Sequence, residues 1–133
     1  MRIVPASIED IAVISQINKV LHEELYTNPA YIKSILRDDE VYLAQTPKNV
    51  AAMHISYIPG ALRIMTIAVN PDMQKKGIGT ALVNFAIHLA QQQEIHTLSC
   101  GTTNTYNSNA FIEKNGFTLV QQNRNSYEYL LKL

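Results

Sequence analysis

Residues 64–89 read Ile-Met-Thr-Ile-Ala-Val-Asn-Pro-Asp-Met-Gln-Lys-Lys-Gly-Ile-Gly-Thr-Ala-Leu-Val-Asn-Phe-Ala-Ile-His-Leu, and this stretch decides the fold. Its first six residues are mostly apolar and several are β-branched, which is typical of a strand that is covered on both faces. Pro71 ends that strand because proline cannot continue a hydrogen-bonded ladder. From Ile78 onward the apolar residues recur at helical spacing. The stretch therefore predicts a buried strand, a glycine-bearing loop and a helix.

The loop between this strand and this helix has the features of an anion site. A helix N-terminus presents unpaired backbone N–H groups and the positive end of the helix dipole. Gly77 and Gly79 have no Cβ, so a ligand can approach the backbone closely there. Lys75 and Lys76 add positive charge. The combination predicts a seat for a phosphate or a pyrophosphate.

Two common nucleotide-binding motifs do not fit this loop. A Rossmann dinucleotide motif would have a third glycine where Leu82 stands. A Walker A motif would need Gly-Lys-Ser/Thr, which the loop does not contain. The remaining alternative is a glycine loop that only connects a strand to a helix.

The rest of the chain alternates strand and helix patterns around this stretch. Residues 51–57 alternate between two faces, and Pro59-Gly60 predicts a hairpin into the organising strand. A strand, a helix and a further strand in succession imply one parallel pair. The expected strands are 2–4, 41–45, 51–57, 62–69, 95–99, 117–121 and 126–131, and the expected helices are 14–25, 31–36, 78–89 and 107–115. This order predicts one α/β domain over residues 1–133, with a mixed sheet that carries helices on both faces.

Composition narrows the class of protein. The 133 residues include 11 basic and 11 acidic ones, which argues against a broad electrostatic surface for nucleic acid or for an anionic membrane. No apolar run approaches the length of a membrane span. Cys100 is the only cysteine, the histidines have no metal-ligand spacing, and the N-terminus has no secretion signal. We expect a cytoplasmic protein without a metal site, with Cys100 as a small buried residue.

Two motifs resemble those of a known family. Gln74-Lys75-Lys76-Gly77-Ile78-Gly79 resembles the Gln/Arg-x-x-Gly-x-Gly/Ala loop of the GNAT N-acetyltransferases, which also follows an apolar strand. Phe111-Ile-Glu-Lys-Asn-Gly-Phe117 is similar to the later Leu/Phe-Tyr-Glu-Lys-x-Gly-Phe segment of that family. The two motifs cover the second half of the chain, whereas the first half is similar only in the order of its elements.

The resemblance implies a fold and a cosubstrate. The fold would be a mostly antiparallel sheet in which one central parallel pair splays apart, and the cosubstrate would be acetyl-CoA. The diphosphate would bind at Gln74, Lys75, Lys76, Gly77, Ile78, Gly79 and Thr80. The backbone of Ile67, Ala68 and Val69 would bind pantetheine, and an N–H near Val69 would stabilise the thioester oxygen. Asn104 would contact the pantetheine or the leaving-group side.

The acid and base of such a reaction are less clear from the sequence. The family places a tyrosine, which protonates the leaving thiolate, where this chain has Ile112. Tyr106 could replace it, although a packing role is the alternative. Many relatives carry a glutamate on the cofactor-binding strand, and residues 61–69 contain no carboxylate. His54, Glu24 or ordered water are then the candidate bases.

The sequence therefore predicts an acetyl-CoA-dependent N-acetyltransferase whose acceptor is a primary amine that attacks directly. A catalytically weak module of the same fold that binds acyl-CoA, or a nucleotide-binding protein, are the alternatives. Small amines, polyamines, amino sugars, peptide N-termini and lysine side chains all stay open as acceptors. The oligomeric state is open as well, a homodimer included.

Overall fold

The computed structural model describes residues 1–133 and contains a seven-stranded sheet in the order β1-β2-β3-β4-β5-β7-β6. All neighbouring strands are antiparallel except β4 and β5, which are parallel. The strands are β1 (Arg2–Pro5), β2 (Glu40–Gln45), β3 (Asn49–Ile58), β4 (Ala61–Val69), β5 (Thr97–Thr103), β6 (Thr118–Gln122) and β7 (Ser126–Lys132). The α-helices are α1 (Ile11–Asn18), α2 (Glu24–Thr27), α3 (Pro29–Asp38), α4 (Ile78–Gln92) and α5 (Asn109–Lys114). The predicted mixed α/β architecture is confirmed.

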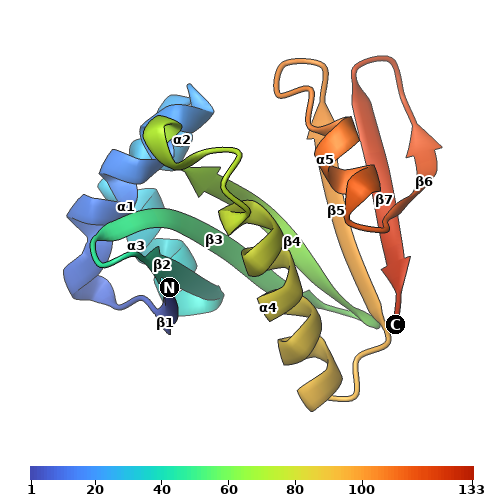
Figure 1. Cartoon of the computed structure of the whole chain (residues 1–133), viewed down its shortest axis with the longest axis horizontal. Helices are drawn as coiled ribbons and strands as arrows, with labels where there is room; N and C mark the ends of the chain where they lie inside the picture. Colours follow the sequence, from blue (N-terminus) through green and yellow to red (C-terminus); the bar gives the residue numbers. More distant parts are fainter.

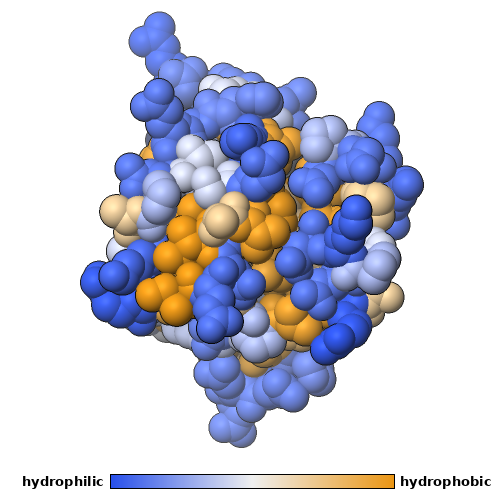
Figure 2. Space-filling view, turned by 90° about the vertical axis from the view of Figure 1, so that its left-hand side faces the viewer, coloured by the Kyte–Doolittle hydropathy of each residue, from blue (hydrophilic) through white to orange (hydrophobic).

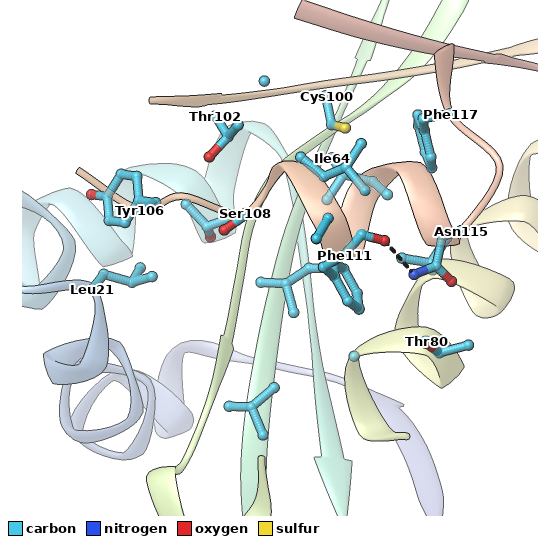
Figure 3. A pocket seen from close by; sticks show the side chains of 18 of the residues that line it. Leu21, Ile64, Thr80, Cys100, Thr102, Tyr106, Ser108, Phe111, Asn115 and Phe117 are labelled. Atoms are coloured by element: carbon cyan, nitrogen blue, oxygen red, sulfur yellow. Dashed lines mark hydrogen bonds between the residues drawn. The ribbon is translucent and has the colours of Figure 1, made fainter. Parts of the chain in front are cut away.

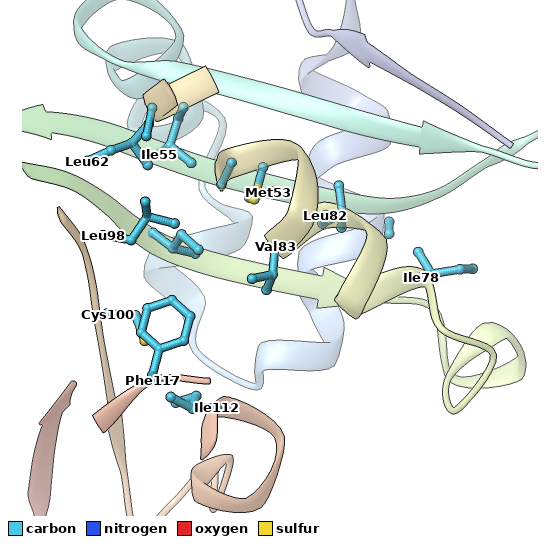
Figure 4. Packing of buried hydrophobic residues seen from close by; sticks show 14 of the residues in the cluster. Met53, Ile55, Leu62, Ile78, Leu82, Val83, Leu98, Cys100, Ile112 and Phe117 are labelled. Carbon is cyan, nitrogen blue, oxygen red and sulfur yellow. The ribbon is translucent and has the colours of Figure 1, made fainter. Parts of the chain in front are cut away.

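Helices cover the sheet on both faces, as the sequence pattern predicted (Figure 1). On one face, Ile14 and Ile17 of α1 and Ile32 of α3 pack against buried residues of β2 to β4. On the other face, the apolar side of α4 packs against β3, β4 and β5, with α5 beside it (Figure 4). The alternation of apolar residues along β3 explains this arrangement, since Ala51 and Met53 contribute to the α4 core while Ala52 contributes to the other core.

The two central strands pair only near their beginnings. The parallel register runs from Leu62, opposite Leu98, to Ile64, opposite Cys100, and then stops. Beyond Ile64 the strands diverge, and Figure 1 shows them opening into a V. A register shift in the ladder between β3 and β4 coincides with the divergence, because Ile64 and Thr66 lie opposite consecutive β3 residues and Met65 is the extra residue. The bulge leaves 43% of Met65 exposed.

One predicted helix is broken in the structure. The expected helix 14–25 ends at Asn18, continues as a 3-10 turn to Leu21, and is interrupted by His22 in the left-handed conformation, with φ of 56°. The side chain of Asn18 donates to the carbonyl of Tyr26 at 2.8 Å, which ties α2 back onto α1. The prediction was wrong because periodicity does not detect such a tertiary hydrogen bond.

Smaller differences concern element ends. β5 begins at Thr97 and reaches Thr103, further along the chain than the predicted strand 95–99. α5 begins at Asn109, with Ser108 at the N-cap position, whereas the helix expected over 107–115 would begin at Asn107, which has φ of 51° in the loop before α5. No helix is both long and apolar enough to cross a membrane. On the side formed by α1, α2 and α3, hydrophilic residues surround a central apolar area (Figure 2).

Candidate functional site

A cleft of about 960 Å³ lies where β4 and β5 diverge. This volume is typical of a site for a small molecule. Its lining comes from both faces of the sheet, including Phe111 and Ile112 of α5 on one face and Tyr26 of α2 on the other. We call the part lined by Gln74–Thr80 the loop end, and the part lined by Arg63, Met65 and Glu128, where the strands meet, the fork end. Leu21 and Tyr106 lie together on the side away from Thr80 and Asn115 (Figure 3).

The loop end presents a run of free backbone donors. None of the N–H groups of residues 75–80 donates to an acceptor in the chain, and the cap residue of α4 makes no side-chain bond. Lys75 and Gly77 both have positive φ, of 61° and 84°, so the loop curls around these groups. A Cβ on Gly79 would lie 3.0 Å from the ring of Phe111 of α5, so a larger residue there would press on that ring. Such a concave set of donors at a helix N-terminus suits an anion.

The edge of β4 presents a second set of free backbone groups. Asn70 N–H donates to the carbonyl of Val50 at 2.9 Å, so the groups of Asn70, Ala68 and Thr66 face β3. The groups of Ile67 and Val69 therefore face the gap, where no strand pairs with them. The carbonyl of Val69 accepts from the Gln74 side chain at 3.0 Å, which leaves the Val69 N–H and both groups of Ile67 free. An extended ligand can bind such an edge as a strand would.

An ion pair spans the fork end. Arg63 of β4 donates to both carboxylate oxygens of Glu128 on β7, at 2.9 and 3.0 Å, and reaches Ser99 of β5 at 3.4 Å. The hydrogen bonds to Glu128 raise the pKa of the Arg63 guanidinium further above its ordinary value. A Cβ on Gly101 would lie 2.7 Å from a Glu128 oxygen, so the pair rests directly on that glycine. Glu128 is the only carboxylate that lines the cleft.

Two hydroxyl groups in the cleft wall have no hydrogen-bond partner. They belong to Thr102 and Tyr106, and both oxygens are buried. Leaving a buried hydroxyl unpaired costs about 1–3 kcal/mol, so each of these groups is available to a ligand or a water molecule in the cleft. The nearby thiol of Cys100 behaves differently, because burial raises its pKa to about 12 and keeps it protonated at neutral pH. A protonated thiol is not a nucleophile.

The structure brings most of the predicted site residues to one cleft. The predicted residues that line it are Ile67, Val69, Gln74, Lys75, Gly77, Ile78, Gly79, Thr80 and Tyr106. Lys76 is exposed beside them and contributes a free N–H. Ala68 is buried against α1 and α3 with its backbone toward β3, so it does not face the gap. Ile112, at the position of the family tyrosine, is 7% exposed and packs into the α4 core.

Three other predicted residues lie outside the cleft. His54 is buried and its Nε2 lies 2.7 Å from Oδ2 of Asp39, while the other oxygen of that carboxylate accepts from the Ser56 hydroxyl. Glu24 is an exposed residue at the start of α2. Asn104 accepts a hydrogen bond from the Tyr127 hydroxyl at 2.9 Å. None of these side chains lines the cleft, so the structure gives them no contact with a ligand there.

The sequence reasoning missed Arg63 and Glu128. In β7 the residues Tyr127, Tyr129 and Leu131 point toward the helix-covered core, and Glu128 stands on the opposite face. That alternation was visible in the sequence and could have marked Glu128 as a carboxylate on a polar face. Its pairing with a residue on β4 could not be read, because 65 positions separate the two.

One comparison with known proteins identifies a family. A family model described as the acetyltransferase (GNAT) family matches residues 7–117. No curated protein sequence gives a significant match.

Solved structures with the same fold are numerous. Ard1 from Thermoplasma volcanium is 21% identical, with a TM-score of 0.83, and the match covers 99% of this chain and 97% of that one. The ribosomal-protein-S18-alanine N-acetyltransferase of Escherichia coli is 19% identical, with a TM-score of 0.84 and coverage of 98% and 92%. PaiA N-acetyltransferase from Thermoplasma acidophilum, solved in complex with coenzyme A, is 15% identical, with a TM-score of 0.83 and full coverage of both chains at 100%. At these identities the structures show a shared fold.

Proposed function

Because the chain belongs to the GNAT acetyltransferase family, whose cosubstrate is acetyl-CoA, we propose that it transfers the acetyl group to a primary amine by direct attack. One observation carries this proposal: the free N–H groups of residues 75–80 open into the same cleft as the unpaired edge of β4. The first set fits a diphosphate and the second fits an extended chain with amide groups.

Two parts of the cleft backbone, the loop end and the edge of β4, would bind different parts of acetyl-CoA. The loop end would hold the diphosphate, with Lys75 and Lys114 as the nearby cations in the lining. The Val69 N–H, next to the loop, would bind a pantetheine amide. The Ile67 N–H lies two residues, or about 7 Å, closer to the fork. It would then stabilise negative charge on the thioester oxygen as the amine attacks.

Two side chains that line the cleft, Glu128 at the fork end and Tyr106 in the loop after β5, would handle the protons. When bound, acetyl-CoA supplies an activated acyl carbon: the amine nitrogen bonds to it and the carbon–sulfur bond breaks. The amine proton would pass to Glu128, directly or through water, since no other carboxylate lines the cleft. The leaving sulfur would receive a proton from the Tyr106 hydroxyl, which has no partner within the chain. Cys100 takes no covalent part because its thiol stays protonated.

The test combines binding with turnover on the full chain. Calorimetry should detect acetyl-CoA binding, and a free-thiol assay with a broad panel of amines should detect transfer. ATP and NAD should bind more weakly than coenzyme A. Absence of acetyl-CoA binding by a folded protein would overturn the proposal.

A second candidate function is a module that binds acyl-CoA without efficient transfer. The buried Ile112 favours it, because no hydroxyl occupies the position where the family carries its proton donor. Its signature would be thermal stabilisation by coenzyme A without thiol release on any amine. We also propose a cytoplasmic location, which cell fractionation would test.

A further inference from the structure

The ion pair between Arg63 and Glu128 lies on the face of the sheet opposite to α4, the helix whose N-terminus forms the loop end. The register places Arg63, Ser99 and Gly101 on the face opposite to α4 and α5, with Glu128 beside Gly101. Helices α1 and α3 cover only β2 to β4 on that face, so β5 and β7 stay open there. The side chains of Arg63 and Glu128 are 26% and 39% exposed.

Both members of the pair keep unused hydrogen-bonding capacity. A guanidinium has five N–H groups, and Arg63 directs one from each terminal nitrogen to Glu128. Each carboxylate oxygen of Glu128 accepts one of these bonds, which leaves a lone pair on each oxygen. Glu128 can therefore accept from an ammonium group and Arg63 can donate to a carboxylate while the two residues stay paired with each other.

The charges along the cleft favour a neutral zwitterion. Its charged lining residues are Arg63, Lys75, Lys114 and Glu128. Lys75 belongs to the loop end, and Lys114 precedes Asn115, which lies near Thr80 (Figure 3). The fork end then holds one positive and one negative charge. A polycation would gain no net electrostatic attraction at the fork end. A molecule with one positive and one negative charge could pair each of them with the opposite charge of the protein.

We propose that the acceptor is a free amino acid whose amine is held by Glu128 and whose carboxylate is held by Arg63. This inference rests on the proposed function and names the substrate class of the same site. Val20, Leu21 and Met65 line the adjoining wall and suit an apolar side chain. A leucine-like amino acid is therefore the first probe.

The test compares three acceptors that share one side chain. They are L-leucine, L-leucinamide, which lacks the carboxylate, and 3-methylbutylamine, which lacks the whole carboxyl group. We expect kcat/KM, expressed per unprotonated amine, to be about 10-fold to 100-fold higher for leucine than for the other two acceptors. This is the contribution expected from one charge-assisted hydrogen bond to the carboxylate. Leucinamide also represents a peptide N-terminus, because its carboxyl group is amidated.

A substitution assigns the preference to Arg63. In Arg63→Gln the ratio of leucine to leucinamide should fall to about one, since one charged hydrogen-bond donor to the carboxylate is lost. The ratio is measured within one variant, so a loss of folded protein does not change it. Arg124→Gln, in the exposed turn between β6 and β7, is the matched control and should keep the ratio of the native protein.

The outcomes separate this inference from the proposed function. Equal or faster turnover of leucinamide overturns the inference, and so does an unchanged ratio in Arg63→Gln. Transfer to simple amines, but to none of the twenty amino acids, overturns it too and leaves the acetyltransferase standing. If acetyl-CoA binds but no acceptor of any kind causes thiol release, both the inference and the proposed transferase activity are overturned. If Arg63→Gln does not fold, the preference of the native protein decides alone.

Discussion

The two ends of the cleft are built in different ways. The loop end consists of consecutive residues, and its donors are backbone N–H groups of residues 75–80. The fork end consists of side chains from different strands, with Arg63 and Met65 on β4 and Glu128 on β7, and the Arg63–Glu128 pair reaches across β5. The loop end depends on local backbone conformation, whereas the fork end depends on the register of the whole sheet.

This difference has a consequence for how each end tolerates substitution. A backbone donor remains whatever side chain its residue carries, provided that φ and ψ are kept. A side-chain site changes its chemistry with each substitution while the fold persists. Changes at the loop end should therefore act through conformation and remove cosubstrate binding. Changes at the fork end should alter acceptor use and leave cosubstrate binding intact.

The largest effect is expected from Gly77→Val. Gly77 has φ of 84° and free space around it, so the variant is strained by its backbone alone. A relaxed loop would misplace the N–H groups, and losing two charge-assisted hydrogen bonds of about 2 kcal/mol each weakens coenzyme A binding about 1000-fold. Calorimetry measures this loss.

Gly60→Val is its matched control. Gly60 also has positive φ, of 77°, and free space, but it lies in the turn between β3 and β4. Both variants should lose about 1–3 kcal/mol of unfolding free energy, and only Gly77→Val should lose coenzyme A binding. Equal affinities in the two variants would contradict the role of the loop.

The next effect concerns turnover. Tyr106→Phe should lower kcat about 100-fold, the usual contribution of a positioned proton donor. It should not lower the unfolding free energy, because the buried hydroxyl has no partner to lose. Tyr129→Phe is the control: it should lower the unfolding free energy and leave kcat unchanged. The Tyr129 hydroxyl donates to Glu113 at 2.7 Å and accepts from Asn109 at 2.8 Å, and both hydrogen bonds would be lost. A normal kcat in Tyr106→Phe would assign the proton to water.

The same contrast explains what the sequence could predict. The strand, the loop and the helix of residues 64–89 are one contiguous pattern, so the fold class, the parallel pair and the loop end could be predicted. The resemblance to the GNAT family added the splayed strands. His54 was a candidate base because the sequence does not show which residue its imidazole contacts, so the side chain could have faced the cleft. In the structure that partner is Asp39, 15 positions away.

The fork end could not be predicted because it depends on tertiary geometry. Arg63 reaches across β5 to Glu128 only because β7 is inserted between β5 and β6. Tyr26 reaches the cleft only because the chain breaks at His22 and turns back. Neither the strand order nor the break has a local signal in the sequence, although both decide which side chains meet an acceptor.

A smaller effect, confined to the fork end, is expected from Gly101→Ala. The new Cβ would lie 2.7 Å from Glu128 Oε1 and 3.1 Å from Arg63 Nη2, so the pair must move. We expect KM for the acceptor to rise about 10-fold, the loss of one well-placed charged contact. The affinity for coenzyme A, measured by calorimetry, should change less than about twofold because the loop is untouched. A parallel loss of both would show that the two ends are coupled.

The smallest effect on turnover is expected from His54→Phe, which tests a residue outside both ends. The imidazole is buried against Asp39, so its loss should lower the unfolding free energy by about 1–3 kcal/mol, as measured by denaturant titration. The kcat/KM should stay within about twofold, because distant sites act independently. Glu24→Gln, at an exposed position, should change neither quantity. A large fall in kcat/KM for His54→Phe with normal stability would mean that protons leave the cleft through β3 rather than at the fork, and Glu128 would then lose its role as the proton acceptor.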